Sequence, residues 1–134
     1  MVEFSPIGII KSEFVETASP DDMKAEKSRI IVDEEYAEGL DKIEENKYLK
    51  IVFHLHRASG YDLIGPRRVG GVRGVFASRS PRRPNPIGVT LVKLLSREEN
   101  ELIVTGLDAV DETPLLDIKP YAADIDDPAH KFVD

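Results

Sequence analysis

The sequence contains no cysteine and no long apolar run. Without thiols the chain has no disulfide framework, no thiolate zinc site and no thiol nucleophile. No stretch reaches the roughly 20 apolar residues that cross a bilayer, and Met1 is not followed by the basic and then apolar segments of a signal peptide. The sequence therefore predicts a cytoplasmic protein without a membrane segment.

The length and composition fit one ordinary globular domain. The chain has 134 residues, of which 41% are hydrophobic and 32% charged. A chain of this size buries about two-thirds of its unfolded surface, which suffices for a core. We expect a single domain over residues 1–134.

Acidic residues are nearly absent from residues 57–83, although the whole chain carries a net charge of −7. This window holds seven arginines, one aspartate (Asp62) and no lysine, a charge of +6, which leaves −13 for the remainder. Local charge decides where a polyanion docks. The pattern favours selective RNA contact and argues against broad non-specific binding.

Residues 48–57 are the clearest central strand. Ile51, Phe53 and Leu55 share one face, and the side chains that alternate with them share the other. Further extended segments are expected at residues 2–11, 28–32, 72–77, 89–95, 102–107 and 115–118, with residues 96–100 linking the fourth and fifth of these. Asp33 is a typical N-cap for one short helix that stops at Gly39. These elements predict an all-β fold, a small β-barrel of about six or more short strands.

Residues 67–88 hold six arginines and three prolines. Proline and glycine at this density exclude a long helix, so we expect a rigid loop around one short strand. The glycines Gly70, Gly71 and Gly74 do not follow a strand and open a helix, which excludes a phosphate-binding fingerprint and favours a tight turn. Arginine forks pair with phosphate or carboxylate. The loop is therefore interpreted as an anion-binding or RNA-binding element.

His54 and His56 lie two residues apart on one strand face. A metal would need a third ligand, and the remaining histidine, His130, lies in an acidic tail that we expect to be loosely held. No metal site is predicted. A polar strand face is favoured, and a role lining a ligand pocket stays open.

Asp117, Lys119 and Tyr121 alternate on one face if residues 115–121 are extended. They form either a structural salt bridge beside a ring or a proton acceptor with orienting donors. The residues alone leave both alternatives open. Residues 111–114, Asp-Glu-Thr-Pro, are typical of a turn.

Three blocks together resemble the TsaA-like (YaeB-like) family. They are I-G-I-I-K-S at residues 7–12, G-V-F-A-S-R-S with R-P-N-P-I-G at residues 74–88, and D-E-T-P with L-D-I-K-P-Y at residues 111–121. The resemblance spans nearly the whole chain and implies a non-Rossmann β-barrel. Bacterial members often carry an additional C-terminal domain, which is not expected here.

The resemblance also implies an activity. Family members are S-adenosylmethionine-dependent methyltransferases that act on N6 of threonylcarbamoyl-adenosine beside the tRNA anticodon. They are homodimers that hold the cofactor near the subunit interface. By motif, the expected cofactor contacts are His56, Arg57, Arg79, Val89, Asp111, Glu112, Thr113 and Pro114.

The chain departs from the family pattern in places. Where the first loop usually offers Pro-Arg-Gln, this chain has Pro20-Asp21-Asp22 or Asp21-Asp22-Met23, which inverts the local charge. Arg57 replaces a usual glutamine, and Glu112 stands where glycine is common. The inversion bears on cofactor affinity, RNA docking and substrate identity.

The leading hypothesis is methyl transfer to an exocyclic amine of a tRNA adenine in the anticodon loop. The amine must lose a proton, and the candidate acceptors are Asp117, Tyr121 and Asp111. The substrate-binding residues are expected to be Arg82, Arg83, Asn85 and Lys119. Two alternatives remain: a non-catalytic RNA-binding barrel, and a small-molecule methyltransferase or sensor that uses the same cofactor.

Overall fold

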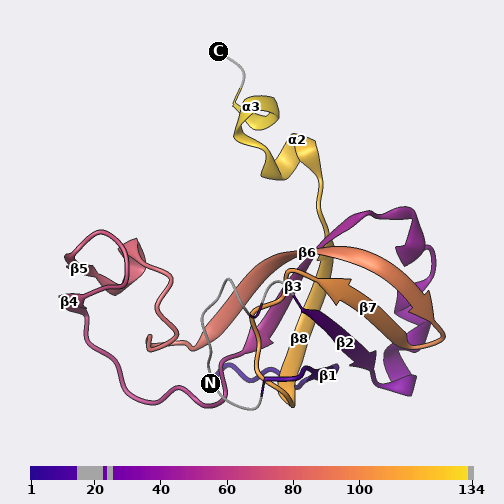
Figure 1. Ribbon diagram of the computed structural model, residues 1–134, viewed down its shortest axis with the longest axis horizontal. Coiled ribbons are helices and arrows are strands. Elements are labelled where there is room, and N and C mark those ends of the chain that lie inside the picture. Colours follow the sequence, from indigo (N-terminus) through magenta and orange to yellow (C-terminus); the bar gives the residue numbers. More distant parts are fainter. Residues whose placement is uncertain (15–22, 24–25, 133–134) are drawn as a thin grey trace.

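The computed structural model describes residues 1–14, 23 and 26–132 (Figure 1). Six antiparallel strands close into a barrel in the order β1-β2-β7-β6-β3-β8, with β8 returning to β1. The strands are β1 (Gly8–Lys11), β2 (Lys27–Val32), β3 (Tyr48–His54), β6 (Ile87–Glu98), β7 (Glu101–Thr105) and β8 (Thr113–Pro120). The predicted all-β barrel is confirmed.

Two groups of elements project from the barrel (Figure 1). One is a lobe formed by the hairpin of β4 (Ile64–Pro66) and β5 (Val72–Gly74) with the 3₁₀ turn η3 (Val75–Ala77). The other is the C-terminal pair α2 (Ala123–Asp126) and α3 (Pro128–Lys131). The 3₁₀ helices η1 (Glu34–Leu40) and η2 (Ile43–Glu45) connect β2 to β3.

The barrel interior is filled by the inward residues of all six strands. The predicted face of β3 is confirmed, since Ile51 and Phe53 are buried and Leu55 packs against the core, whereas His54 is exposed. Gly8 is required where β1 meets β2, because a Cβ there would lie 2.2 Å from the Ile31 carbonyl oxygen. The alternation of inward and outward residues thus decides which side chains remain available outside the barrel.

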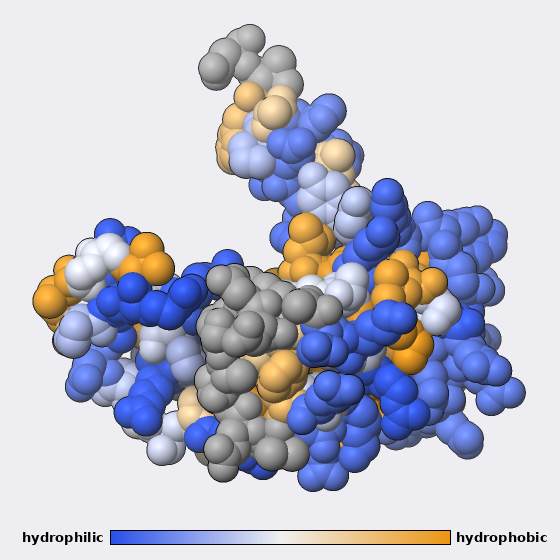
Figure 2. All heavy atoms as spheres, in the orientation of Figure 1, coloured by the Kyte–Doolittle hydropathy of each residue, from blue (hydrophilic) through white to orange (hydrophobic). Residues whose placement is uncertain are grey.

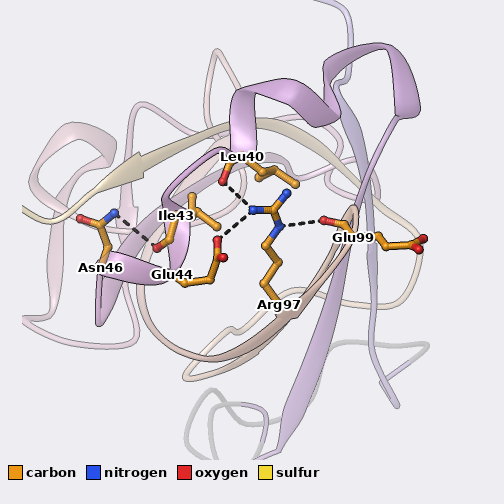
Figure 3. Close-up of polar contacts among 6 residues, drawn as sticks. All are labelled: Leu40, Ile43, Glu44, Asn46, Arg97 and Glu99. Atoms are coloured by element: carbon orange, nitrogen blue, oxygen red, sulfur yellow. Dashed lines mark hydrogen bonds and ion pairs between the residues drawn. The ribbon is translucent and has the colours of Figure 1, made fainter.

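Arg97 on β6 fastens the η1–η2 connection to the barrel (Figure 3). Its Nη1 donates to the Leu40 carbonyl at 3.1 Å and to the Glu44 carboxylate at 2.8 Å, and its Nε donates to the Glu99 carbonyl at 2.8 Å. The hydrogen bond from Arg97, with one from the backbone, lowers the pKa of Glu44. This arginine is therefore a structural clamp.

Several element boundaries differ from the predictions. The strand expected over residues 72–77 ends at Gly74, because the chain turns into η3, where the Ser78 amide donates to the Val75 carbonyl at 3.2 Å. β4 lies in a stretch, residues 58–68, for which no strand was predicted. β6 runs to Glu98, so its link to β7 is two residues long. The C-terminal tail is fixed to the barrel by a 2.8 Å ion pair between Lys50 and Asp126.

Candidate active site and nucleic-acid interface

Three strands meet at one end of the barrel, which we call the His54 end. β3 finishes at His54, where its register partner is Ile87, the first residue of β6. Phe53 pairs with Leu115, so β8 also begins here, at Thr113. The His54 end therefore brings together segments that are far apart in the sequence.

The predicted cofactor residues lie around this end. His56 and Arg57 follow β3 directly, and Val89 is the third residue of β6. Residues 111–114 form the entry to β8. Arg79 joins the group because its Nη2 donates a 2.5 Å hydrogen bond to the Val89 carbonyl. Seven of the eight residues thus lie within three residues of the ends of β3, β6 and β8, and Arg79 is joined to them by its hydrogen bond.

The turn before β8 is held by its own side chains. Asp111 Oδ1 accepts the Ser12 amide at 2.9 Å, and Thr113 Oγ1 donates to the Val110 carbonyl at 2.6 Å. Glu112 adopts φ +66°, the left-handed region that favours glycine, and its exposed carboxylate lies 3.2 Å from Lys11 Nζ. Asp111 and Thr113 therefore shape the turn, and Glu112 presents its carboxylate to solvent.

Asp117 and Lys119 form an ion pair with a 2.9 Å separation between Oδ2 and Nζ. The hydrogen bond and charge of Asp117 raise the pKa of Lys119. Asp117 pairs with Val52, which on its other side pairs with Val89. At about 4.8 Å between strands, Asp117 lies roughly 10 Å from Val89 along the outer face.

Tyr121 lies at the opposite end of β3. Its amide donates to the Tyr48 carbonyl at 3.1 Å, and the two rings meet edge to face with centroids 6.4 Å apart. Tyr48 and His54 are the first and last of the 7 residues of β3, so they lie about 20 Å apart at roughly 3.3 Å per step along the strand. A single copy of the chain thus keeps the Tyr121 phenol away from the predicted cofactor residues.

Four of the six arginines of residues 67–88 donate to backbone carbonyls in or beside the same loop. The acceptors are Asp62 and Arg73 for Arg67, Ala77 for Arg73, Val89 for Arg79, and Ser78 and Ser80 for Arg83. Four of the six acceptor residues, Asp62, Ala77, Ser78 and Ser80, lie outside the strands, where carbonyls lack ladder partners and the guanidinium groups supply the missing donors. This bracing role was not predicted, because the sequence shows arginines but not which carbonyls they reach.

Two arginines of this loop have guanidinium groups that remain available to bind a ligand. Arg68 and Arg82 are exposed, and within the described residues their side chains make no hydrogen bond or ion pair. Asn85 is also exposed. Arg82 and Asn85, predicted to bind substrate, are therefore accessible, and Arg83 offers the donors that remain beyond Nη1.

The two best-formed pockets of the described residues contain none of the predicted cofactor residues. One, of about 300 Å³, lies beside Arg97 between η2 and β6. The other, of about 210 Å³, lies between residues 58–61 and 81–86. Beside the His54 end, the outer face of β6 leaves Ile87, Val89 and Leu91 at 41%, 40% and 50% exposure. In one copy the predicted cofactor residues thus surround an open, partly apolar surface.

The rings of His54 and His56 lie 6.4 Å apart between centroids. Over the described part of the chain, no three histidine, cysteine, aspartate or glutamate side chains cluster closely enough to hold a metal ion. Within that same part, no helix has the length and apolar character needed to span a membrane.

The sequence model of the tRNA-methyltransferase O N-terminal domain matches residues 9–127. The chain belongs to this family. The resemblance to TsaA-like proteins is thereby confirmed.

Relatives and solved structures agree with this assignment. A protein of Archaeoglobus fulgidus named S-adenosyl-L-methionine-binding protein is 41% identical, over 90% of both chains. The mouse tRNA (adenine(37)-N6)-methyltransferase is 42% identical over 71% of this chain and 22% of its own length. A crystal structure of TrmO superposes with a TM-score of 0.77 at 33% identity, covering 95% of this chain and 60% of that one. The chain thus spans less than two-thirds of the TrmO structure.

The family departures at Pro20, Asp21 and Asp22 lie outside the described residues. Those at Arg57 and Glu112 lie at the His54 end. At Glu112 the positive φ gives a physical reason why glycine suits the position.

Proposed function

We propose that this chain is an S-adenosylmethionine-dependent tRNA methyltransferase that modifies N6 of threonylcarbamoyl-adenosine beside the anticodon. The observation that carries the proposal is the register of β3, β6 and β8, which brings their ends together next to the arginine loop. Seven of the eight predicted cofactor residues lie within three residues of these strand ends, and Arg79 donates a hydrogen bond to Val89. The names of the Archaeoglobus and mouse relatives support the cofactor and the reaction. A tRNA substrate agrees with the cytoplasmic location expected from the sequence.

The residues at the His54 end fit this cofactor. S-adenosylmethionine supplies a methyl group on a sulfonium, with an adenine ring, a ribose and an amino acid around it. Val89 and Ile87 offer an apolar surface for a ring, and the exposed Glu112 carboxylate accepts hydrogen bonds from hydroxyl or ammonium groups. Arg79 keeps donors for a carboxylate beyond the one bound to Val89.

The substrate side is the arginine loop. Arg82 and Arg83 contact the phosphates of the anticodon loop, Asn85 reads a base edge through its amide, and Lys119 supports the RNA backbone. Bidentate guanidinium pairing also suits the carboxylate of the threonyl group. Because the rest of the chain is acidic, this loop concentrates RNA binding at one side of the barrel.

Asp117 is the best-placed proton acceptor of the three candidates. Its carboxylate lies on the outer face of β8, in line with Val52 and Val89. Asp111 has one oxygen committed to the Ser12 amide and the other available. Tyr121 reaches the same centre only if a second copy of the chain presents it.

A homodimer completes the site in this proposal. Two observations support a second copy at this face. The apolar residues on the outer face of β6 are exposed, and neither of the two best-formed pockets of the described chain contains a predicted cofactor residue. Leu91→Lys should produce a monomer with weakened cofactor binding, as measured by light scattering and calorimetry. Tyr36→Lys on η1 is the control and should leave both properties unchanged. A dimeric Leu91→Lys variant would contradict this arrangement.

Methyl transfer tests the activity directly. Purified protein with labelled S-adenosylmethionine should transfer label to tRNA that carries threonylcarbamoyl-adenosine, and Asp117→Asn should slow the transfer by about 10²–10⁴-fold, the usual contribution of a general base. Robust RNA binding without transfer would instead support the non-catalytic barrel. Absence of cofactor binding at millimolar concentration would refute the proposal.

Salt dependence tests the substrate class. Arg82→Ala combined with Arg83→Ala removes two phosphate contacts. The slope of log K against log salt should therefore become shallower by about 1.4, at roughly 0.7 per contact with a single strand. Arg29→Ala on β2, an exposed arginine on another strand, is the matched control. Turnover and salt dependence that do not respond to the double variant would point to a small-molecule substrate.

A further inference from the structure

A small notch lies between residues 58–61 and the end of the arginine loop, and of the residues that line it only Arg83 has been given a role so far. Two stretches of the chain line it: residues 58–61, which include Tyr61, and residues 81–86, which contribute Arg83 and the prolines Pro81, Pro84 and Pro86. We call it the Tyr61 notch. Its volume is about 210 Å³, the liquid volume of about seven waters at roughly 30 Å³ each, which suits one aromatic heterocycle.

The notch has a fixed shape. The ring of a proline locks its backbone φ angle, and three prolines line the notch. The Leu55 amide donates to the Pro86 carbonyl at 2.8 Å, a hydrogen bond that holds Pro86 beside the end of β3. Arg83 Nη1 donates to the Ser78 and Ser80 carbonyls at 3.2 and 3.0 Å, which fixes the guanidinium. A ring that enters the notch therefore meets a preorganised surface.

The chemistry of the rim is cationic. Arg83 keeps its other donors, and the neighbouring Arg82 side chain is exposed and makes no hydrogen bond or ion pair with the described residues. Asp62, which directly follows Tyr61, is the only acidic residue between residues 57 and 83, and its backbone carbonyl accepts a hydrogen bond from Arg67. An aromatic ring flanked by guanidinium groups matches an unstacked base with its phosphate.

The notch borders the His54 end. Residues 58–61 of its lining follow His56 and Arg57 in the chain, and Pro86 precedes Ile87, the register partner of His54. A nucleotide in the notch is therefore a neighbour of whatever base reaches the His54 end. RNA that is fully paired keeps its bases stacked and cannot offer one to the notch.

We propose that the Tyr61 notch holds one unstacked base of a single-stranded RNA loop, stacked on Tyr61, with the adjoining phosphate on Arg82 and Arg83. The inference rests on the proposed function, in which this base is a neighbour of the modified adenosine. The notch then sets which loop sequence and loop shape the protein accepts.

The absence of tryptophan from the chain provides a clean reporter. In Tyr61→Trp the indole is the only one present, and an anticodon stem-loop RNA should quench its fluorescence, whereas a fully paired RNA of equal length should not. Tyr36→Trp is the matched control, because Tyr36 on η1 is similarly exposed, at 44% against 51% for Tyr61. Equal quenching by paired RNA, or equal quenching of the control, would overturn stacking in the notch.

Affinity gives the second measurement. Tyr61→Ala should raise the Kd for the stem-loop about 5- to 150-fold, the equivalent of about 1–3 kcal/mol for one stacked base. Tyr61→Phe keeps the ring and should stay within threefold of the unmodified protein, and the Kd for S-adenosylmethionine should stay within twofold in both variants. A Tyr61→Ala variant that loses cofactor affinity instead of RNA affinity would assign the notch to the cofactor and overturn the proposal.

The two proposals fail in different ways. If the unmodified protein transfers methyl groups and Tyr61→Ala binds the stem-loop equally well, the notch is refuted and the activity stands. If the stem-loop quenches Tyr61→Trp but no methyl transfer occurs, the notch stands and the proposed activity is refuted.

Discussion

Gly88 and Phe53 face each other at the His54 end, and exchanging Gly88 for alanine tests whether this end is packed as described. The two residues are register partners between β6 and β3. A Cβ on Gly88 would lie 2.6 Å from Cε2 and Cζ of Phe53, a ring that is only 2% exposed. The ring has to shift inside a packed core to admit the methyl group.

The magnitude follows from two opposing terms. Overpacking a core costs about 1–3 kcal/mol. Gly→Ala elsewhere stabilises by about 0.4–1 kcal/mol, because alanine restricts the unfolded chain. The net loss for Gly88→Ala should be about 1–2 kcal/mol. With a urea m-value of about 2 kcal/mol/M, the midpoint of unfolding should fall by about 0.5–1 M.

Gly39→Ala provides the matched control. Gly39 lies in η1, and a Cβ there meets nothing within 4 Å. Its midpoint should stay level or rise, so the two alanine variants should differ in sign. Phe53→Leu added to Gly88→Ala should cost less than the sum of both single changes, because the shorter side chain makes room. A Gly88→Ala midpoint equal to that of Gly39→Ala would refute the contact.

Three further predictions concern single residues. Glu112→Gly should raise the free energy of unfolding by up to about 1 kcal/mol in urea titrations, because glycine adopts φ +66° without strain; a loss would show that the side chain is needed for folding. Arg97 lowers the pKa of Glu44, so this pair adds stability above the ordinary glutamate pKa of 4.5 and loses it as the pH falls through the lower folded pKa. The difference in melting temperature between Glu44→Gln, which keeps the other bonds of Arg97, and the unmodified protein should therefore shrink below pH 4.5, and a constant difference would contradict the pair. Asp117→Asn should return the raised pKa of Lys119 towards 10.5 in NMR titrations, and an unchanged pKa would mean that Asp117 is not its cause.

The barrel strands were predictable because their signal is local. In residues 48–57 the apolar residues recur at every second position, and β3 buries those residues. β4 escaped prediction because it is three residues long and contains Gly65 and Pro66, which are typical of loops. Its pairing with β5 depends on the turn at Gly70 and Gly71, both at positive φ, and short-range patterns do not reveal such pairing.

The candidate site was predictable only in part. The alternation of Asp117 and Lys119 left an ion pair and a proton acceptor as open alternatives, and the structure contains the ion pair. The place of Tyr121 depends on strand register over the whole of β3, which the sequence does not display. The Tyr61 notch was not predicted either, because the two stretches that line it, residues 58–61 and 81–86, are about 20 residues apart in the chain and meet only in three dimensions.

The pairing of His54 with Ile87 has a consequence for how this fold can diversify. Residues 55–86, a stretch of 32 residues, leave the barrel and return to it at adjacent points of one ladder. Doubling the length of such an excursion costs only about 0.6 kcal/mol of closure entropy. The barrel can therefore keep its stability and its strand register while this insert is lengthened, shortened or exchanged, so that, under the proposed function, recognition of new RNA loops can evolve separately from folding.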